Sequence, residues 1–287
     1  GTQFMTTAIG ADANFGKGQI NNKAHLGAGI QLFNDVGGDS KYGNQAASLT
    51  LSGILPMGYG HSLSAGIQGG YGQRKADISR LSFMSQWNGS YLDPTILSGE
   101  ANSVTSFRYI DASAGLYYVY DGSKNNFARK NEMKIQFGLA GFHLNAPELK
   151  FSNGINGERL HRKYVGNIGI VSDIVGSKFA IDASVVQFVQ GGHYETLLGM
   201  MVRYRFEDGT KMTGLSHNAF VGFGCYTRLK DAIIPSVMVD WRGFQFGVSY
   251  DITLSALRYA YKGGSLEFSL TYRNVHDALF KTRKRRF

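Results

Sequence analysis

The feature that most constrains this chain is a strict two-residue alternation of apolar and polar side chains near its end. From Phe244 to Leu254, apolar Phe, Val, Tyr, Ile and Leu occupy every second position, with Gln, Gly, Ser, Asp and Thr between them. After a turn at Gly263 and Gly264, the alternation resumes and runs to Arg273. A period of two is typical of β-strands with one apolar and one polar face. The pattern predicts an all-β chain and leaves open which face turns inward.

Two antiparallel architectures fit this alternation. A β-sandwich buries its apolar face in a core, whereas an outer-membrane β-barrel turns that face toward lipid and keeps polar side chains inside. The composition suits many strands with glycine-rich turns and aromatic anchors, since the chain has 38 Gly, 19 Phe, 16 Tyr and only 4 Pro. It contains no apolar run of about 18 residues that would make a membrane-spanning helix. That absence does not exclude a barrel, because barrel strands are short and only half apolar.

Alternating segments recur from one end of the chain to the other, without a helical period or a linker between them. We therefore expect a single domain over residues 1–287, with a basic C-terminal tail at 274–287. The segments predicted to be strands are 4–15, 24–33, 46–56, 62–73, 109–120, 132–144, 165–172, 178–188, 194–206, 217–228, 232–241, 243–254 and 264–273.

The predicted connections alternate between a shorter and a longer class. The shorter ones are 57–61, 121–131, 173–177, 207–216 and 242–243. The connections between them include the long stretches 34–45, 74–108, 145–164 and 255–263, with 189–193 and the Lys230–Asp231 turn as short exceptions. Bacterial outer-membrane barrels have short periplasmic turns and long external loops, so this order predicts a periplasmic C-terminus and an external start of the first segment. Closure with both ends in the periplasm needs an even strand number. We therefore expect about 14 strands, with one strand before Gly1 missing from this chain.

Aromatic residues favour the barrel over the sandwich, which remains the alternative. They gather toward the ends of the predicted strands, as they do in the interfacial belts of membrane barrels. These residues are Phe15, Phe33, Tyr71, Tyr109, Tyr120, Phe206, Tyr226, Trp241 and Tyr272. The polar faces carry Asp182 and Asp251, and Arg203, Arg205 and Arg273 can share that side. We expect them to form ion pairs that point into the barrel, with a pore lining that tunes ion selectivity as the alternative.

Charge and motif content exclude several function classes. The net charge is +9, but much of it lies in the 274–287 tail, so we expect no nucleic-acid partner. The single Cys225 excludes an internal disulfide and a cysteine zinc cluster. The histidines show no metal-ligand spacing, and no nucleophile motif such as GxSxG is present. We expect no metal, no cofactor and no enzymatic activity.

Five stretches carry a family resemblance. They are LGAGIQLFNDVGG at 26–38, SLSAGIQGGYGQRKAD at 62–77, GLAGFHLNAPELKF at 138–151, RLHRKY at 159–164, and SYDITLSALR followed by GGSLEFSLTYR near the end. Together they resemble the PorP/SprF family of outer-membrane proteins of the Bacteroidetes type IX secretion system. The ending of the family is matched by Tyr250, Asp251, Ser255, Gly263, Gly264, Ser265 and Glu267. The asparagine- and proline-rich segment and first strand usual in the family are not present, and the basic end is longer than the family's.

The resemblance implies a barrel in the Gram-negative cell outer membrane that contacts outer-membrane lipid and works with other type IX secretion components. It further implies export or surface anchoring of a secreted cargo protein, such as a gliding adhesin, whose C-terminal domain docks on the barrel. The loop at 74–108, rich in adaptable polar and aromatic residues, suits such docking. We expect partner-binding residues in the long loops at Trp87, Tyr91, His143, Pro147, Arg162 and Tyr164. A passive outer-membrane pore for small solutes is the alternative function.

Overall fold

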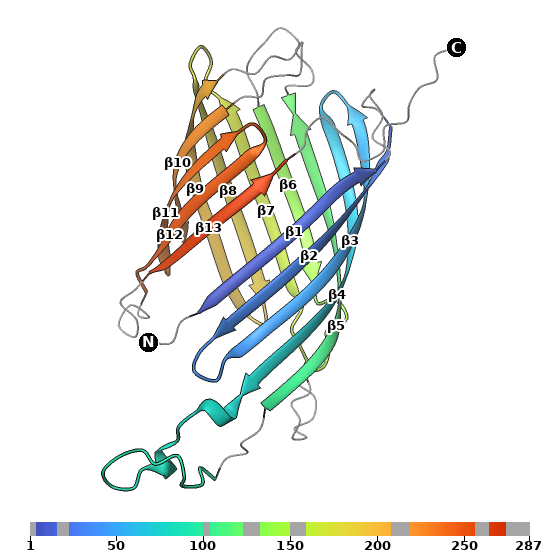
Figure 1. The fold of residues 1–287 in the computed structure, drawn as a ribbon. Helices are drawn as coiled ribbons and strands as arrows, with labels where there is room; N and C mark the ends of the chain where they lie inside the picture. Colours follow the sequence, from blue (N-terminus) through green and yellow to red (C-terminus); the bar gives the residue numbers. More distant parts are fainter. Residues whose placement is uncertain are drawn as a thin grey trace.

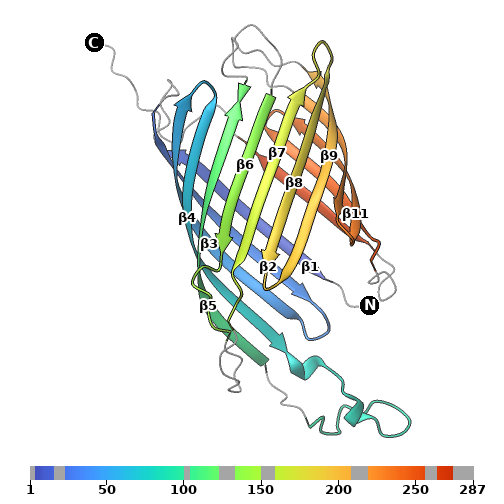
Figure 2. The ribbon, with the colours of Figure 1, turned by 180° about the vertical axis from the view of Figure 1, so that it is seen from behind.

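The computed structural model describes residues 4–15, 23–99, 104–122, 133–149, 159–207, 219–255 and 264–273. Within these ranges, thirteen antiparallel strands form one sheet in which sequence neighbours pair. They are β1 (Met5–Phe15), β2 (His25–Gly37), β3 (Tyr42–Gly58), β4 (His61–Asp77), β5 (Val104–Asp121), β6 (Met133–Phe142), β7 (Lys163–Asp173), β8 (Phe179–Gln190), β9 (His193–Glu207), β10 (Ala219–Arg228), β11 (Ala232–Trp241), β12 (Phe244–Thr253) and β13 (Ser265–Tyr272). The sheet curls into an open barrel (Figures 1 and 2). The predicted tail at 274–287 lies outside the described residues.

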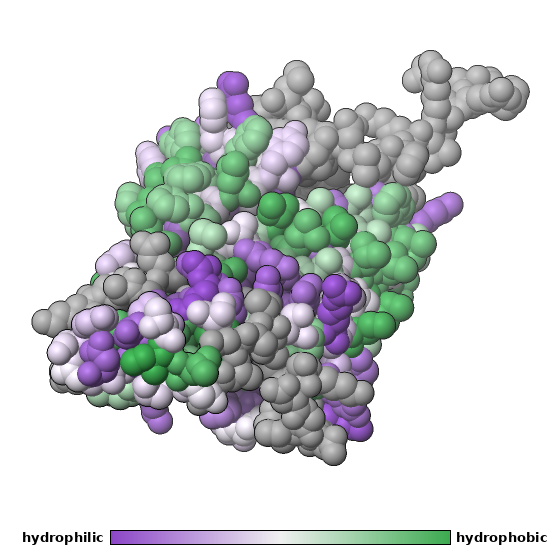
Figure 3. Space-filling model, turned by 60° about the horizontal axis from the view of Figure 1, so that its bottom comes forward, coloured by the Kyte–Doolittle hydropathy of each residue, from purple (hydrophilic) through white to green (hydrophobic). Residues whose placement is uncertain are grey.

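The strands form because their alternation gives the curled sheet two different faces. On β3, Leu49, Leu51 and Leu55 are exposed by 64%, 61% and 51%, while the residues between them are partly covered. Cross-strand pairing places apolar residues next to apolar residues, as with Leu51 beside Ile67 and Val237 beside Val248. Hydrophobic residues thus cover the outer wall (Figure 3), and polar residues lie on the inner face. No described helix has the length and hydropathy needed to cross a membrane.

The two ends of the sheet differ, and we name them by their connections. The turn end, at the top of Figure 1, holds residues 59–60, 174–178 and 242–243; the loop end, at the bottom, holds 38–41, 78–99, 143–149, 159–162, 191–192 and 229–231. Two hairpins are tight because their residues adopt positive φ angles: Gly191 and Gly192 at the loop end, Arg242 and Gly243 at the turn end. The described connections therefore lie at the ends to which the prediction assigned them.

One of the predicted long loops is wrong. The stretch 34–45 is mostly strand, because β2 continues to Gly37, β3 begins at Tyr42, and residues 38–41 alone make the turn. The polar residues of this stretch pair across the hairpin, where Gln45 Nε2 donates to Asn34 Oδ1 at 3.1 Å. Polar side chains on both faces are typical of a loop in sequence, but here they extend a hairpin beyond the apolar wall.

Aromatic residues gather at the turn end, as expected, although not all predicted members take part. The rings of Phe244 and Tyr272 lie 4.7 Å apart, and those of Phe179 and Tyr204 lie 5.3 Å apart, all on the outer face. Three predicted belt residues, Phe33, Tyr109 and Tyr226, instead occupy inner-face positions of their strands. Each follows the odd or even parity of its own strand, so a position near a strand end does not by itself determine the face.

The inner face of the β7 to β13 wall carries inward ion pairs, as expected, although Asp173, Asp240 and Arg228 were not among the predicted members. Arg203 pairs with Asp182, Arg205 Nη2 lies 2.5 Å from Asp173 Oδ2, and Arg273 Nη2 lies 2.8 Å from Asp240 Oδ2. Nearer the loop end, Arg228 contacts both Asp231 at 2.5 Å and Asp251 at 2.6 Å. Partly buried charges require such partners, and each of these charged side chains has at least one.

Strands β1 and β13 come round to the same side of the molecule (Figure 1). They run in the same direction, because an antiparallel order gives all odd-numbered strands one direction. Within the described residues, each pairs on one side only, β1 with β2 and β13 with β12. Every other strand pairs on both sides, so the sheet is open between its first and last strands.

Candidate partner-binding surface

The β4–β5 loop forms a compact unit that projects from the loop end (Figure 1). It contains two short 3-10 helices, η1 (Ile78–Arg80) and η2 (Met84–Gln86), and a bridge between Trp87 and Leu92. The buried Gln86 holds the unit together. Its Nε2 donates to the Ile96 carbonyl at 3.0 Å, and its Oε1 accepts from the Phe83 amide at 2.9 Å. The loop therefore has a shape of its own, held by hydrogen bonds within it.

Two tight turns complete this unit. Asn88 Oδ1 accepts from the amides of Ser90 and Tyr91, each at 3.0 Å, and so shapes the turn that carries Tyr91. In the next turn Asp93 Oδ1 accepts from the Thr95 hydroxyl at 2.6 Å and the Thr95 amide at 2.9 Å. These bonds favour the ionised carboxylate and hold the pKa of Asp93 below its usual range, first through the hydroxyl and second through the amide.

The unit presents apolar side chains outward. Trp87 and Tyr91 are 47% and 60% exposed, and Met84 and Leu97 are 83% and 88% exposed. Figure 3, which brings the loop end forward, shows hydrophobic residues among hydrophilic ones at this end. Large aromatic and Met side chains on a preformed polar frame are the residue types enriched at protein interfaces.

The β6–β7 connection begins differently, by returning to the sheet. Strand β5 extends beyond the end of β6, and residues 143–145 follow its free edge. The Leu144 amide donates to the Ala112 carbonyl at 2.8 Å, and Asn145 Nδ2 donates to the Ile110 carbonyl at 2.7 Å. His143 adopts a positive φ of 57° and lies on the inner side, where its Nδ1 is 2.9 Å from Asp111 Oδ1.

Further along, the same connection covers part of the inner mouth at the loop end. Leu160 packs with Phe107 and Tyr109 of β5 in a buried cluster, against which Leu149 is also packed. The Leu160 amide donates to the Pro147 carbonyl at 2.9 Å, which ties the two arms of the connection together. Burying apolar side chains here stabilises the connection over the mouth.

A hollow of about 1370 Å³ opens beside this cover. Basic side chains from the β6–β7 connection and from β7, β9 and β10 line it, with Glu195 and Asp231 as its acidic residues; the basic ones are Arg159, His161, Arg162, Lys163, His193 and Arg228. Arg159 Nη2 lies 3.5 Å from Glu148, and Arg228 has its two aspartate partners. Lys163 Nζ lies 4.6 Å from the centre of the Phe188 ring. The hollow therefore carries an excess of positive charge.

The six predicted partner-binding residues fall into two groups. Trp87 and Tyr91 share the projecting β4–β5 loop, while His143, Pro147, Arg162 and Tyr164 belong to the β6–β7 connection and the start of β7. Their role in binding stays a prediction. Met84 and Leu97 are the most exposed apolar residues of the projecting loop and were not predicted. The only sequence signal for these two residues is an apolar side chain within a polar segment. That signal does not distinguish an exposed side chain from a buried one.

The described residues contain no group of three or more His, Cys, Asp or Glu placed to hold a metal ion. Cys225 is exposed on the outer face of β10.

The chain is similar to a known protein family and, more distantly, to a solved structure. A solved structure of CdiB from Acinetobacter baumannii matches with 10% sequence identity and a TM-score of 0.43, covering 94% of this chain and 54% of that one, so this chain spans about half of its length. No curated protein matches the chain. Residues 2–272 match the family described as "Type IX secretion system membrane protein PorP/SprF". That family is one of secretion-system membrane proteins and is not an enzyme family. This chain belongs to the PorP/SprF family of type IX secretion system membrane proteins.

Proposed function

We propose that this protein is an outer-membrane barrel, formed by a single domain, that holds a secreted cargo protein at the cell surface. In this proposal its external loops bind the C-terminal domain of the cargo, such as a gliding adhesin, beside other type IX secretion components. The observation that carries the proposal is the projecting β4–β5 loop, which is internally hydrogen-bonded and presents Trp87 and Tyr91 outward. A preformed loop loses little conformational entropy when a partner binds.

The sidedness of the barrel follows from the connections. Short turns face the periplasm and long loops face outward in bacterial barrels, so we place the loop end outside the cell. The outer face has the apolar surface that a bilayer requires, with aromatic residues at its turn end. On this placement Trp87 and Tyr91 project away from the cell.

We further propose that one additional strand lies between β1 and β13 and closes the barrel. Because β1 and β13 run in the same direction, a strand antiparallel to both would complete about 14 strands. Unpaired strand edges are costly in lipid, since each unsatisfied backbone group costs several kcal/mol. A density map in which β1 pairs directly with β13 would exclude this closure.

The anchoring proposal is tested by replacing residues 80–101 with a short Gly–Ser linker, which leaves β4 and β5 intact. Cargo is expected to move from the cell surface into the medium, measured by immunoblotting of both fractions. Heat-modifiable migration on gels shows whether the barrel still folds. A matched control replaces Tyr59, an exposed aromatic of the turn end, with Ala. Cargo that stays on the surface when the loop is replaced would contradict the proposal.

A passive pore for small solutes is the second candidate, favoured by a hollow to which polar side chains of the inner face contribute. The hollow measures about 480 Å³, and Asp12, Thr50, Ser64, Gln68 and Ser113 contribute to its lining. Conductance in planar bilayers separates the two functions. An anchor whose mouth is partly covered by the β6–β7 connection is expected to pass little steady current, whereas a pore conducts steadily whether or not cargo is bound.

A further inference from the structure

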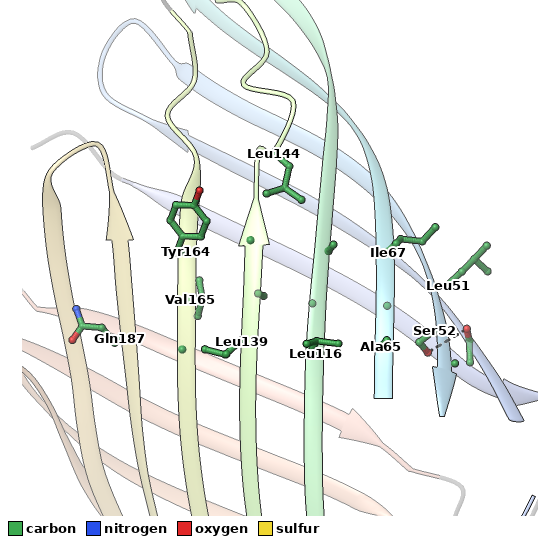
Figure 4. A pocket seen from close by; sticks show the side chains of 18 of the residues that line it. Leu51, Ser52, Ala65, Ile67, Leu116, Leu139, Leu144, Tyr164, Val165 and Gln187 are labelled. Carbon is green, nitrogen blue, oxygen red and sulfur yellow. Dashed lines mark hydrogen bonds between the residues drawn. The ribbon is translucent and has the colours of Figure 1, made fainter. Parts of the chain in front are cut away.

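A long apolar groove crosses the outer wall from β2 to β8. It has a volume of about 990 Å³ and is lined almost entirely by apolar residues and glycine. Two neighbouring cross-strand rows form it: one contains Leu51, Ile67, Ala114, Gly141 and Tyr164, and the other Gly53, Ala65, Leu116, Leu139 and Gly166. In the first row the large residues lie on β3, β4 and β7, and in the second row they lie on β5 and β6. The small residues beside them form a floor between leucine and isoleucine ridges (Figure 4).

The groove ends at the loop end against the β6–β7 connection. Leu144 lies over the floor there, since a Cβ added to Gly141 would come within 2.9 Å of Leu144 Cδ2. Tyr164 stands beside it, and Figure 4 shows these two side chains together at one end of the groove. Tyr164 is the second residue of β7 and faces outward. It lies at the depth where aromatic residues meet lipid headgroups.

A positive charge lies at this end of the groove. Arg162 Nε donates to the Leu144 carbonyl at 3.1 Å, which fixes the guanidinium beside Tyr164 and Leu144. Among the described residues, no carboxylate lies within ion-pair distance of Arg162 or Lys163, whereas Arg159 and Arg228 have acidic partners. Tyr164 lines both the apolar groove and the basic hollow. The two features are therefore parts of one amphiphilic surface.

We propose that this surface binds one phosphorylated lipid of the surrounding leaflet. An acyl chain lies in the groove between the leucine ridges, and the phosphate accepts hydrogen bonds from the terminal nitrogens of Arg162 at the entrance to the basic hollow. Arginine suits this role because its planar guanidinium binds phosphate with two parallel bonds. Charge complementarity at the end of an apolar groove favours a lipid over an acidic polypeptide, which would leave the groove uncovered. The site is separate from the projecting β4–β5 loop, and it requires only that the wall faces a bilayer.

The test compares two probe lipids that differ in headgroup charge and share their acyl chains, phosphatidylglycerol and phosphatidylcholine. Each is titrated into the detergent-solubilised full chain, and bound lipid is counted by native mass spectrometry. We expect phosphatidylglycerol to bind at least tenfold more tightly. Replacing Arg162 with Gln is expected to remove this preference, and Arg162→Lys to restore part of it. The matched control is Arg242→Gln, an arginine lying 4.7 Å from the outward Trp241 ring at the turn end, away from the groove.

A second variant tests the acyl-chain part of the site. An added Cβ at Gly166 would meet only Leu139 Cδ2, at 3.6 Å, so Gly166→Leu has room to fold while it fills the groove. It is expected to weaken both lipids several-fold without changing their ratio. Equal binding of the two lipids to the unmodified protein, or a preference that survives Arg162→Gln, overturns the proposal. So does displacement of bound phosphatidylglycerol by soluble polyglutamate, which would assign the charge to an acidic polypeptide. These measurements of lipid binding do not involve cargo. The lipid proposal can therefore be overturned while the proposal of anchoring through the β4–β5 loop is unaffected.

Discussion

The two long connections of the loop end direct their hydrogen bonds and apolar side chains in opposite ways. The β4–β5 loop bonds mainly to itself, around Gln86, and turns its large apolar side chains outward. The β6–β7 connection bonds to the sheet and turns Leu160 inward onto Phe107 and Tyr109. One presents apolar surface and the other buries it. The comparison teaches that loop length alone does not identify a binding loop; what matters is where the loop's own hydrogen bonds and apolar groups go.

The largest expected effect comes from removing what the β4–β5 loop presents. Trp87→Ala with Tyr91→Ala should weaken binding of the cargo C-terminal domain by about 1000-fold, because interface aromatics of this kind contribute about 2 kcal/mol each. Biolayer interferometry with the isolated cargo domain measures the change. His193→Ala, in the basic hollow at the same end, is the control. A cargo affinity that remains within a factor of three would show that the exposed aromatics are not the contact.

A smaller effect is expected from releasing the β6–β7 connection. Leu160→Asp places a carboxylate in a buried apolar cluster, which costs several kcal/mol unless the connection leaves the mouth. Trypsin should then cut at Arg159, Arg162 or Lys163 at least tenfold faster, as followed by mass spectrometry of timed digests. Leu160→Met, which keeps the apolar contact, should digest like the unmodified protein. Equal rates for Leu160→Asp and Leu160→Met would mean that the cluster does not hold the connection.

The smallest effect is a pH response confined to the β4–β5 loop. The pKa of Asp93 is lowered in the folded loop by its bonds to Thr95, so the stabilisation is fully present above the ordinary value of 3.8 and is lost as pH falls through the lower folded value. Hydrogen exchange of the Thr95 amide, read by NMR, should therefore accelerate only in strong acid. In Asp93→Ala the exchange should be fast at every pH. Thr95 protection that persists in Asp93→Ala would remove the carboxylate from the explanation.

Much of the strand arrangement could be predicted from the sequence, because alternation is set by the strand backbone itself. All thirteen predicted segments correspond to strands of the sheet. The ends of the strands were harder to predict. Asn34 and Gln45 lie in the β2–β3 hairpin, but polar residues of this kind are equally typical of a loop. Tyr109 and Tyr226 were assigned to an outer belt by their place near strand ends, but strand parity puts them on the inner face.

The candidate surface was less predictable than the strands. Trp87 and Tyr91 could be selected as large aromatics in a long polar loop, and the structure places both on its exposed side. Leu144 could not be selected, because its position over Gly141 depends on a connection that returns to the sheet. Contacts between segments distant in sequence, such as Leu160 on Phe107, leave no local pattern that a sequence could reveal.

The Asn145 side chain has one further consequence. Its carboxamide carries the donor and acceptor of a peptide group in one plane, and it uses both: Nδ2 bonds the Ile110 carbonyl at 2.7 Å, and Oδ1 accepts from the Ala112 amide at 3.1 Å. A single side chain thus imitates the next residue of β6 after the backbone has turned away. Free strand edges invite pairing with other extended chains. At Ile110 and Ala112 the edge of β5 is already hydrogen-bonded. A polypeptide passing the mouth of this barrel therefore cannot add a strand to β5 at that place.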